Sequence, residues 1–255
     1  MTPAADDVVG RDEQLRSFDR IMDAGRPAVV LVTGHVGSGK SRFLRELGTR
    51  ARACGWRTVP APEQPGLVVT RDATPQSLAR QILEVLATGA ADGAIDANPV
   101  RDAFALSRGV AASSVAFRPP ASVAGDEIAS TLIRAVREVC PALIGVDGFR
   151  PNAALARWLA DRLAPAIRES GLPVVTVLTL EAEPPADLLR SVDQHFALGR
   201  LDEAATERHF RALGDRLHPP MGDDELRVYV RAATARPELV HSLHRVLALA
   251  ERPGR

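Results

Sequence analysis

The octapeptide GHVGSGKS at residues 34–41 constrains the fold more than any other stretch of this chain. It fits the pattern G-x-x-x-x-G-K-[ST], whose glycines let the backbone close around an anion while loop amides and a helix N-terminus point at that anion. The pattern is meaningful only between a strand and a helix. Residues 27–34 are the continuous β-branched run of a central parallel strand, and residues 40–54 follow with a helical composition. The sequence therefore predicts a phosphate-binding loop.

One side chain of this loop differs from every other basic residue of the chain. Lys40 is the only lysine among the 32 lysines and arginines. Arginine is a planar fork and lysine a compact charge on a thin stem, so the two do not exchange freely in a tight loop. We expect Lys40 to bind the β- and γ-phosphates of ATP, and the Ser41 hydroxyl to bind Mg²⁺. A glycine-rich turn with a chance lysine is the alternative. The candidate nucleotide contacts along the loop are Gly34, His35, Val36, Gly37, Ser38, Gly39, Lys40, Ser41 and Arg42.

Apolar runs alternate with helical patterns from residue 27 to residue 199. This alternation predicts an α/β fold, a P-loop three-layer sandwich with helices on both faces of a parallel central sheet. Further strands are expected at residues 56–62, 142–147, 172–180 and 195–199. The first of these contains prolines, which place it at an edge of the sheet. Helices are expected at residues 74–88, with Thr74 as N-cap and Pro75 after it, at 126–140 and at 151–170.

Two segments depart from this alternation. Residues 89–124 are rich in Ala, Gly, Ser and Pro, and we expect a flexible insertion there, with a possible helix near residues 99–107. After residue 199 the pattern is only helical, with helices expected at residues 202–216 (N-cap Asp202), 223–234 and 237–252. The sequence therefore predicts a nucleotide-binding domain over residues 1–199 and a small all-helical lid over residues 200–255.

A phosphate loop works together with an acidic residue at the tip of a neighbouring strand, which holds Mg²⁺ through its water shell. Asp147 ends the apolar run ALIGVD and is the candidate, with a strand-terminating Asp-Gly turn as the alternative. A second acid directly after it would orient the attacking water, but Gly148 stands there, so slow hydrolysis is expected. Glu63 is either a replacement base or a solvated loop residue.

These motifs make residues 8–250 resemble the AAA+ ATPases, most closely the branch near the STAND signalling ATPases and the AAA ATPase domains of bacterial regulators. The phosphate loop matches that family fully, and Asp147 matches its Walker B acid. The stretch VVGRDEQL at residues 8–15 is similar to the N-terminal hhGRxxE signature, although Gln14 stands at the glutamate position. The resemblance implies ATP and Mg²⁺ as ligands, and it implies adenine contacts by Val9, Gly10 and Arg11.

The resemblance also implies a residue that senses the γ-phosphate. The stretch VVTVLTLEAE at residues 174–183 is similar to the sensor-1 strand, which implies that Thr179 lies near that phosphate. The arginine that often follows is absent, and Leu180 and Glu181 stand in its place. An ordinary strand residue is the alternative interpretation of Thr179.

Two further arginines are implied in the last third of the chain. Arg190 lies near the usual position of an arginine finger, where Val192 stands. The stretch AATARPELVHSL at residues 232–243 is similar to the lid motif, in which Arg236 or Pro237 would contact the nucleotide. Solvated helix charges are the alternative for both arginines.

Charge and hydropathy disfavour two classes of partner, nucleic acids and membranes. The formal net charge is zero, whereas nucleic-acid binders usually carry a basic excess, so nucleic acid is possible but not favoured. No apolar run approaches the roughly 20 residues of a membrane span, and residues 1–10 lack the features of a signal peptide. We expect a cytoplasmic protein without membrane association. Cys54 and Cys140 have no metal-like spacing and are expected to be buried thiols.

Four functions compete for this sequence. The favoured one is a slowly hydrolysing, nucleotide-dependent switch that acts on a partner protein or on other copies of itself, because the second acid is absent and no arginine stands at the finger position. A ring-forming remodelling ATPase would need both groups. A DNA-associated ATPase of the replication-initiator or transposition-regulator type would need DNA affinity. A small-molecule kinase would need an acceptor site that the sequence does not suggest.

Overall fold

The structure, a computed structural model, describes residues 8, 10–61, 67–70, 72–91, 121–150, 152–181, 183–215, 220–235 and 242–243. Its centre is a parallel sheet in the order β2-β4-β5-β1-β6, with β3 also paired to β4. The strands are β1 (Ala28–Thr33), β2 (Arg57–Val59), β3 (Leu67–Val68), β4 (Ala142–Asp147), β5 (Val174–Leu180) and β6 (Gln194–Ala197). The predicted α/β class with a parallel sheet is confirmed, and β2 lies at the edge as its prolines indicated.

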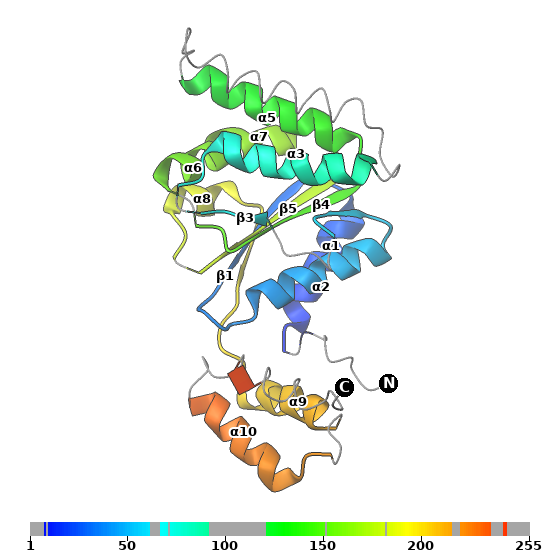
Figure 1. Ribbon diagram of the computed structural model, residues 1–255, viewed down its shortest axis with the longest axis vertical. Helices are drawn as coiled ribbons and strands as arrows, with labels where there is room; N and C mark the ends of the chain where they lie inside the picture. The colour runs from blue at the N-terminus through cyan, green and yellow to red at the C-terminus, as the bar shows by residue number, and fades with distance from the viewer. Residues whose placement is uncertain are drawn as a thin grey trace.

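Helices cover both faces of this sheet (Figure 1). One face carries α3 (Pro75–Ala91), α5 (Ala121–Arg137), α6 (Ala153–Trp158) and α7 (Ala164–Glu169), and the other carries α1 (Asp12–Ala24) and α2 (Lys40–Ala53). The short helix α8 (Ala186–Ser191) precedes β6. No helix in the described ranges is long and apolar enough to cross a membrane.

Strand β1 shows why the sheet needs both layers. All six of its residues are buried. Val29 and Leu31 belong to the core under α3 and α5, whereas Val30 and Val32 belong to the core under α1 and α2. Successive side chains of a strand point to opposite faces, so a continuous apolar run has to be covered on both sides. This burial fixes β1, and with it the start of the phosphate loop.

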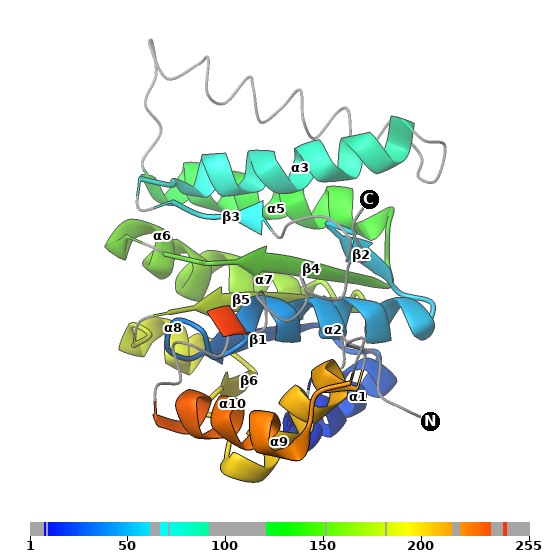
Figure 2. The same cartoon turned by 60° about the horizontal axis from the view of Figure 1, so that its bottom comes forward.

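A separate apolar cluster holds the helices that follow β6. It joins α9 (Glu203–Gly214) to α10 (Asp223–Ala235) through Phe210, Leu213, Leu226, Val230 and Ala233. Asp202 caps α9 as predicted, because its carboxylate accepts a hydrogen bond of 2.6 Å from the Ala205 amide. Figure 2 shows α9 and α10 together on the far side of the sheet from α3 and α5.

Three expectations about helices need correction. Residues 89–91 and 121–124 belong to the ends of α3 and α5, so the predicted insertion is too wide. Alanine favours helix, but the high content of Ala, Gly, Ser and Pro was interpreted as a sign of flexibility.

The helix expected at 151–170 has a π-helical segment, η2 (Leu159–Leu163), between α6 and α7. Pro165 cannot donate to the carbonyl four residues earlier and its ring would crowd that turn, so a wider turn precedes it. The helices expected at 99–107 and 237–252 fall almost wholly outside the described residues.

The two cysteines do not share the predicted burial. Cys140 is half-buried, and burial raises its pKa to about 11 although Arg137 opposes this shift. Cys54 is exposed, because it follows the last turn of α2 at the point where the chain leaves for β2. Both are free thiols.

Candidate nucleotide-binding site

The phosphate loop spans the turn between β1 and α2. A Cβ on Gly34 would lie 2.6 Å from the carbonyl oxygen of Leu198 and 2.5 Å from the Ser38 hydroxyl oxygen. Such separations are far below van der Waals contact, so only glycine allows the backbone to pass here. The loop is thereby fitted against the chain that leaves β6.

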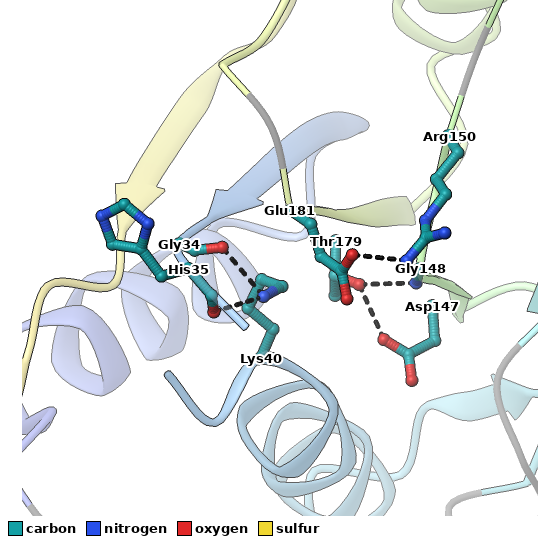
Figure 3. Close-up of polar contacts among 8 residues, drawn as sticks. All are labelled: Gly34, His35, Lys40, Asp147, Gly148, Arg150, Thr179 and Glu181. Atoms are coloured by element: carbon teal, nitrogen blue, oxygen red, sulfur yellow. Dashed lines mark hydrogen bonds and ion pairs between the residues drawn. The ribbon is translucent and has the colours of Figure 1, made fainter. Parts of the chain in front are cut away.

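Lys40 begins α2 and turns its ammonium back over the loop (Figure 3). Its Nζ donates hydrogen bonds to the carbonyl oxygens of Gly34, at 2.9 Å, and His35, at 2.8 Å. The residue is only 7% exposed, and this burial lowers its pKa, while the carboxylates of Glu181 and Asp147 oppose the shift. An ammonium has three donors, so Lys40 can still reach an anion without leaving the loop.

The rest of the loop is open to a ligand from solvent. His35 and Ser41 are exposed, and Val36 at the loop tip is 72% exposed. Arg42 is half-buried. The Ser38 hydroxyl is buried and has no hydrogen-bond partner among the residues described. The loop therefore presents its backbone and the Ser41 hydroxyl outward, at the first turn of α2, where anions are stabilised.

Asp147 and Thr179 meet at the carboxyl ends of two neighbouring strands, β4 and β5. The Thr179 hydroxyl donates to Asp147 Oδ1 at 2.6 Å and accepts from the Gly148 amide at 2.8 Å (Figure 3). Thr179 is completely buried. The sequence predicted Asp147 as a Mg²⁺ ligand and, by resemblance, Thr179 near the γ-phosphate; the structure adds that Thr179 orients the Asp147 carboxylate.

Gly148 has a backbone requirement of its own. Its φ is +64°, in the left-handed region, where side-chain-bearing residues are strained by roughly 1–2 kcal/mol. No atom lies within 4 Å of a Cβ built there, so the constraint is torsional and not steric. The Asp-Gly turn and the Walker B position are thus compatible interpretations of the same pair of residues. A glutamate at position 148 would have room but would strain the turn.

Glu181 is a site residue that the sequence interpretation passed over. It follows β5 directly, and its carboxylate forms an ion pair of 2.5 Å with Arg150, which follows β4 (Figure 3). Both side chains are partly exposed. The available signal was position, because functional groups of parallel sheets gather at the carboxyl ends of the strands. From the sequence alone, Glu181 was notable only for standing, with Leu180, where an arginine often follows this strand.

The donor set suits Mg²⁺ brought in with phosphates. No group of three or more His, Cys, Asp or Glu side chains that could hold a metal ion exists among the described residues. Mg²⁺ is ordinarily bound by one or two protein oxygens together with substrate phosphates and water. The Asp147 carboxylate and the Ser41 hydroxyl are oxygen donors of that kind, so both remain our predicted ligands.

The remaining predicted contacts are not joined to this cluster. Arg190 lies on the surface of α8, where it forms an ion pair with Asp187 of the same helix. Its role as a finger, which would act on another copy of the chain, stays a prediction. Four residues lie outside the described part of the chain, namely Val9, Glu63, Arg236 and Pro237.

Arg11 joins the N-terminal segment to the connection between β6 and α9. The residue is 7% exposed, and its guanidinium donates to the Gly199 carbonyl oxygen at 2.5 Å. Burial lowers the pKa of Arg11, and the carboxylate of Asp202 partly offsets this. The preceding Gly10 packs so closely on α9 that a Cβ would lie 2.7 Å from the Ala205 Cβ. Gly10 and Arg11, the predicted adenine contacts, thus also attach the N-terminal segment to the start of α9.

We expect Arg11→Ala to lower the free energy of unfolding by about 2 kcal/mol, since it removes the hydrogen bond that the charged Arg11 side chain donates to Gly199. Arg11→Lys is expected to recover only part of this loss because lysine lacks the planar fork. Urea denaturation measures the difference. Arg16→Ala, on the exposed side of the same helix, is the control and should change stability by no more than about 0.5 kcal/mol. Equal losses of stability in Arg11→Ala and Arg16→Ala would show that the Arg11–Gly199 bond does not stabilise the fold.

Comparison with known proteins agrees with this geometry. The family model described as "AAA ATPase domain" matches residues 7–255. An uncharacterized protein of Rhizobium meliloti (strain 1021) is 25% identical over 223 residues, covering 80% of this chain and 22% of that protein. The chain thus spans about a fifth of the length of its curated relative.

Two solved structures align with this chain. A STAND (signal transduction ATPase with numerous domains) protein with a tetratricopeptide repeat sensor from Pyrococcus horikoshii aligns with a TM-score of 0.51 and 15% identity, covering 100% of this chain and 31% of that one. A chain of the HORMA:CdnC:Trip13 complex of E. coli MS115-1 gives a TM-score of 0.48 and 12% identity, covering 92% and 81%. The phosphate loop, the parallel sheet and the family match together show that the chain belongs to the AAA ATPase domain family and is a nucleotide-binding AAA+ ATPase.

Proposed function

We propose that this chain is a nucleotide-dependent switch that binds Mg²⁺-ATP, hydrolyses it slowly and passes the change to a partner protein or to other copies of itself. The observation that carries the proposal is the turn after Asp147. A glycine with φ of +64° stands there instead of a second acid, next to Asp147, which accepts from Thr179, and in the same chain as the loop lysine Lys40. Slow turnover lengthens the lifetime of the ATP state, which suits a switch better than a motor.

The change would pass from the sheet to the helices after residue 199. We propose that residues 1–199 form the nucleotide-binding domain and residues 200–255 the lid, with the phosphates bound by the loop and Mg²⁺ held by Ser41 and Asp147. When bound, Mg²⁺ neutralises phosphate charge. Lys40 orients the β- and γ-phosphates, and Thr179 keeps Asp147 in position. Gly34 of the loop lies against the Leu198 carbonyl, and Arg11 is bonded to Gly199. Through these contacts a change in the loop would reach the start of α9.

Single-turnover hydrolysis, with the chain in excess over labelled ATP, tests this proposal. We expect ATP to bind and to be hydrolysed well below about 1 s⁻¹, the lower end of the typical enzyme range. We also expect hydrogen exchange along residues 199–215 to differ between the ATP and ADP complexes. Turnover that is faster, rises with protein concentration and is lost in Arg190→Ala would instead support a ring-forming remodelling ATPase. Identical exchange in both complexes would argue against a switch.

A further inference from the structure

Hydrolysis on this chain needs a carboxylate near the γ-phosphate, and the structure offers a candidate away from the usual position. Lys40 is the residue expected to hold that phosphate. Among the residues drawn in Figure 3, Glu181 and Asp147 are the two carboxylates on the side of the site toward which the Lys40 ammonium lies. Asp147 is already engaged by the Thr179 hydroxyl and is the predicted metal ligand. Glu181 is therefore the carboxylate on this side of the site that is not assigned to the metal, and its partner is Arg150.

The sheet explains why Glu181 can face the loop. Strand β5 lies between β4, which carries Asp147, and β1, which carries the loop. The Gly34 amide donates to the Leu180 carbonyl oxygen at 3.3 Å, so the chain leaves β5 beside the first residue of the loop. Figure 3 shows the Glu181 side chain between Lys40 and Asp147, with its carboxylate directed toward Arg150. Glu181 thus occupies the gap between the phosphate-binding and metal-binding groups.

We propose that Glu181 orients and deprotonates the attacking water in ATP hydrolysis, and that its ion pair with Arg150 restrains it; this rests on the proposed ATPase function. The water oxygen forms a bond to the γ-phosphorus as the bond from that phosphorus to the bridging oxygen breaks. ADP leaves with the electron pair of the broken bond. One water proton passes to the Glu181 carboxylate and from there to the released phosphate, which restores the base.

Arg150 determines when Glu181 is available. The pair is short, 2.5 Å, but the side chains are 54% and 33% exposed, so solvent screens it and the partners can exchange. While the ion pair is formed, one oxygen of the Glu181 carboxylate is engaged by Arg150. Movement of Arg150 toward the phosphates of ATP, or toward a bound partner, would release Glu181. The ion pair would then slow basal hydrolysis further, in addition to the missing acid at Gly148, and would leave Glu181 as a base that can be released.

The experiment measures ATP affinity and the single-turnover rate separately in the full chain. Glu181→Gln keeps the size of the side chain and removes the base, so we expect the rate to fall about 100-fold, within the usual range for a general base. Affinity should stay the same or tighten, because a negative charge beside the phosphates is lost. Glu181→Asp should retain more activity than Glu181→Gln. Glu183→Gln, two residues further on and exposed, is the matched control and should behave like the parent.

Arg150→Gln tests the restraint and is expected to raise the rate several-fold, with the gain lost in the double variant with Glu181→Gln. A parent that binds no ATP would overturn the proposed function itself. A parent that binds and hydrolyses ATP, with Glu181→Gln as fast as the parent, would overturn only the role of Glu181. The role of Glu181 would also be overturned if the parent binds ATP without hydrolysing it and Arg150→Gln does not hydrolyse ATP either.

Discussion

Lys40→Ala is expected to abolish measurable ATP binding, and Lys40→Arg to be nearly as damaging. The ammonium is the buried positive centre of the loop, tied to the carbonyls of Gly34 and His35. Loss of charged hydrogen bonds to phosphate costs about 3 kcal/mol or more, which corresponds to at least about a 100-fold loss of affinity. An arginine keeps the charge, but its planar fork does not fit the space between two loop carbonyls. Isothermal titration with Mg²⁺-ATP measures both effects.

Arg45→Ala provides the matched control, since it removes a positive charge from an exposed position of the same helix. The ATP affinity of Arg45→Ala should stay within about twofold of the parent, because salt screens a charge that is exposed to solvent. Thermal melts of each variant exclude unfolding as the cause. If Lys40→Arg binds ATP like the parent, the retention of this lysine in an arginine-rich chain needs another explanation.

Asp147→Asn is expected to weaken the binding of Mg²⁺-ATP by about 10- to 100-fold, the usual effect of removing a group that orients a metal's surroundings. The amide oxygen can still accept the Thr179 hydrogen bond, so the turn should survive while the negative charge is lost. Metal-free ATP, measured in the presence of a chelator, should bind almost as well as to the parent. Equal losses with and without metal would overturn the assignment of Asp147 to Mg²⁺.

Asp161→Asn, on an exposed position of the π-helical segment, is the control for the loss of one carboxylate. It should leave both affinities unchanged. Asp147→Ala distinguishes orientation from charge, because it also deprives Thr179 of its acceptor. We expect Asp147→Ala to lower stability in addition to metal-dependent binding, and Asp147→Asn to lower only the latter.

The fold was predictable where periodicity and local chemistry agree. The buried strands β1, β4 and β5 are continuous apolar runs, and Thr74, which caps α3 through the Ser77 amide, was identified from its position before a proline. The first helix, α1, was not predicted, although Leu15, Phe18 and Met22 are buried at helical spacing. The π-helical segment could not be predicted, because the search for helices assumed the regular period of 3.6 residues.

The candidate site was predictable where residues act through the backbone of one short segment, and much less so where strands bring distant residues together. The loop at residues 34–41 is read from a single motif. The Thr179–Asp147 bond joins residues 32 apart, and the Arg150–Glu181 pair joins residues 31 apart. Such pairs depend on the register of β4 against β5, which no local pattern specifies. The contact of Arg11 with Gly199, 188 residues away, depends in the same way on tertiary packing.

The position of β1 in the sheet also determines when the ATP site can exist during synthesis. Its two neighbours, β5 and β6, come late in the chain, and Val29 is bonded to Asp193, 164 residues away. At about 5–20 residues per second, a ribosome needs roughly 8–30 s to make that interval. For that time the apolar strand β1 lacks both of its neighbours in the sheet. Nucleotide binding at the loop can then begin only after β6 has been made, and the stability that it adds rises with the logarithm of the ATP concentration.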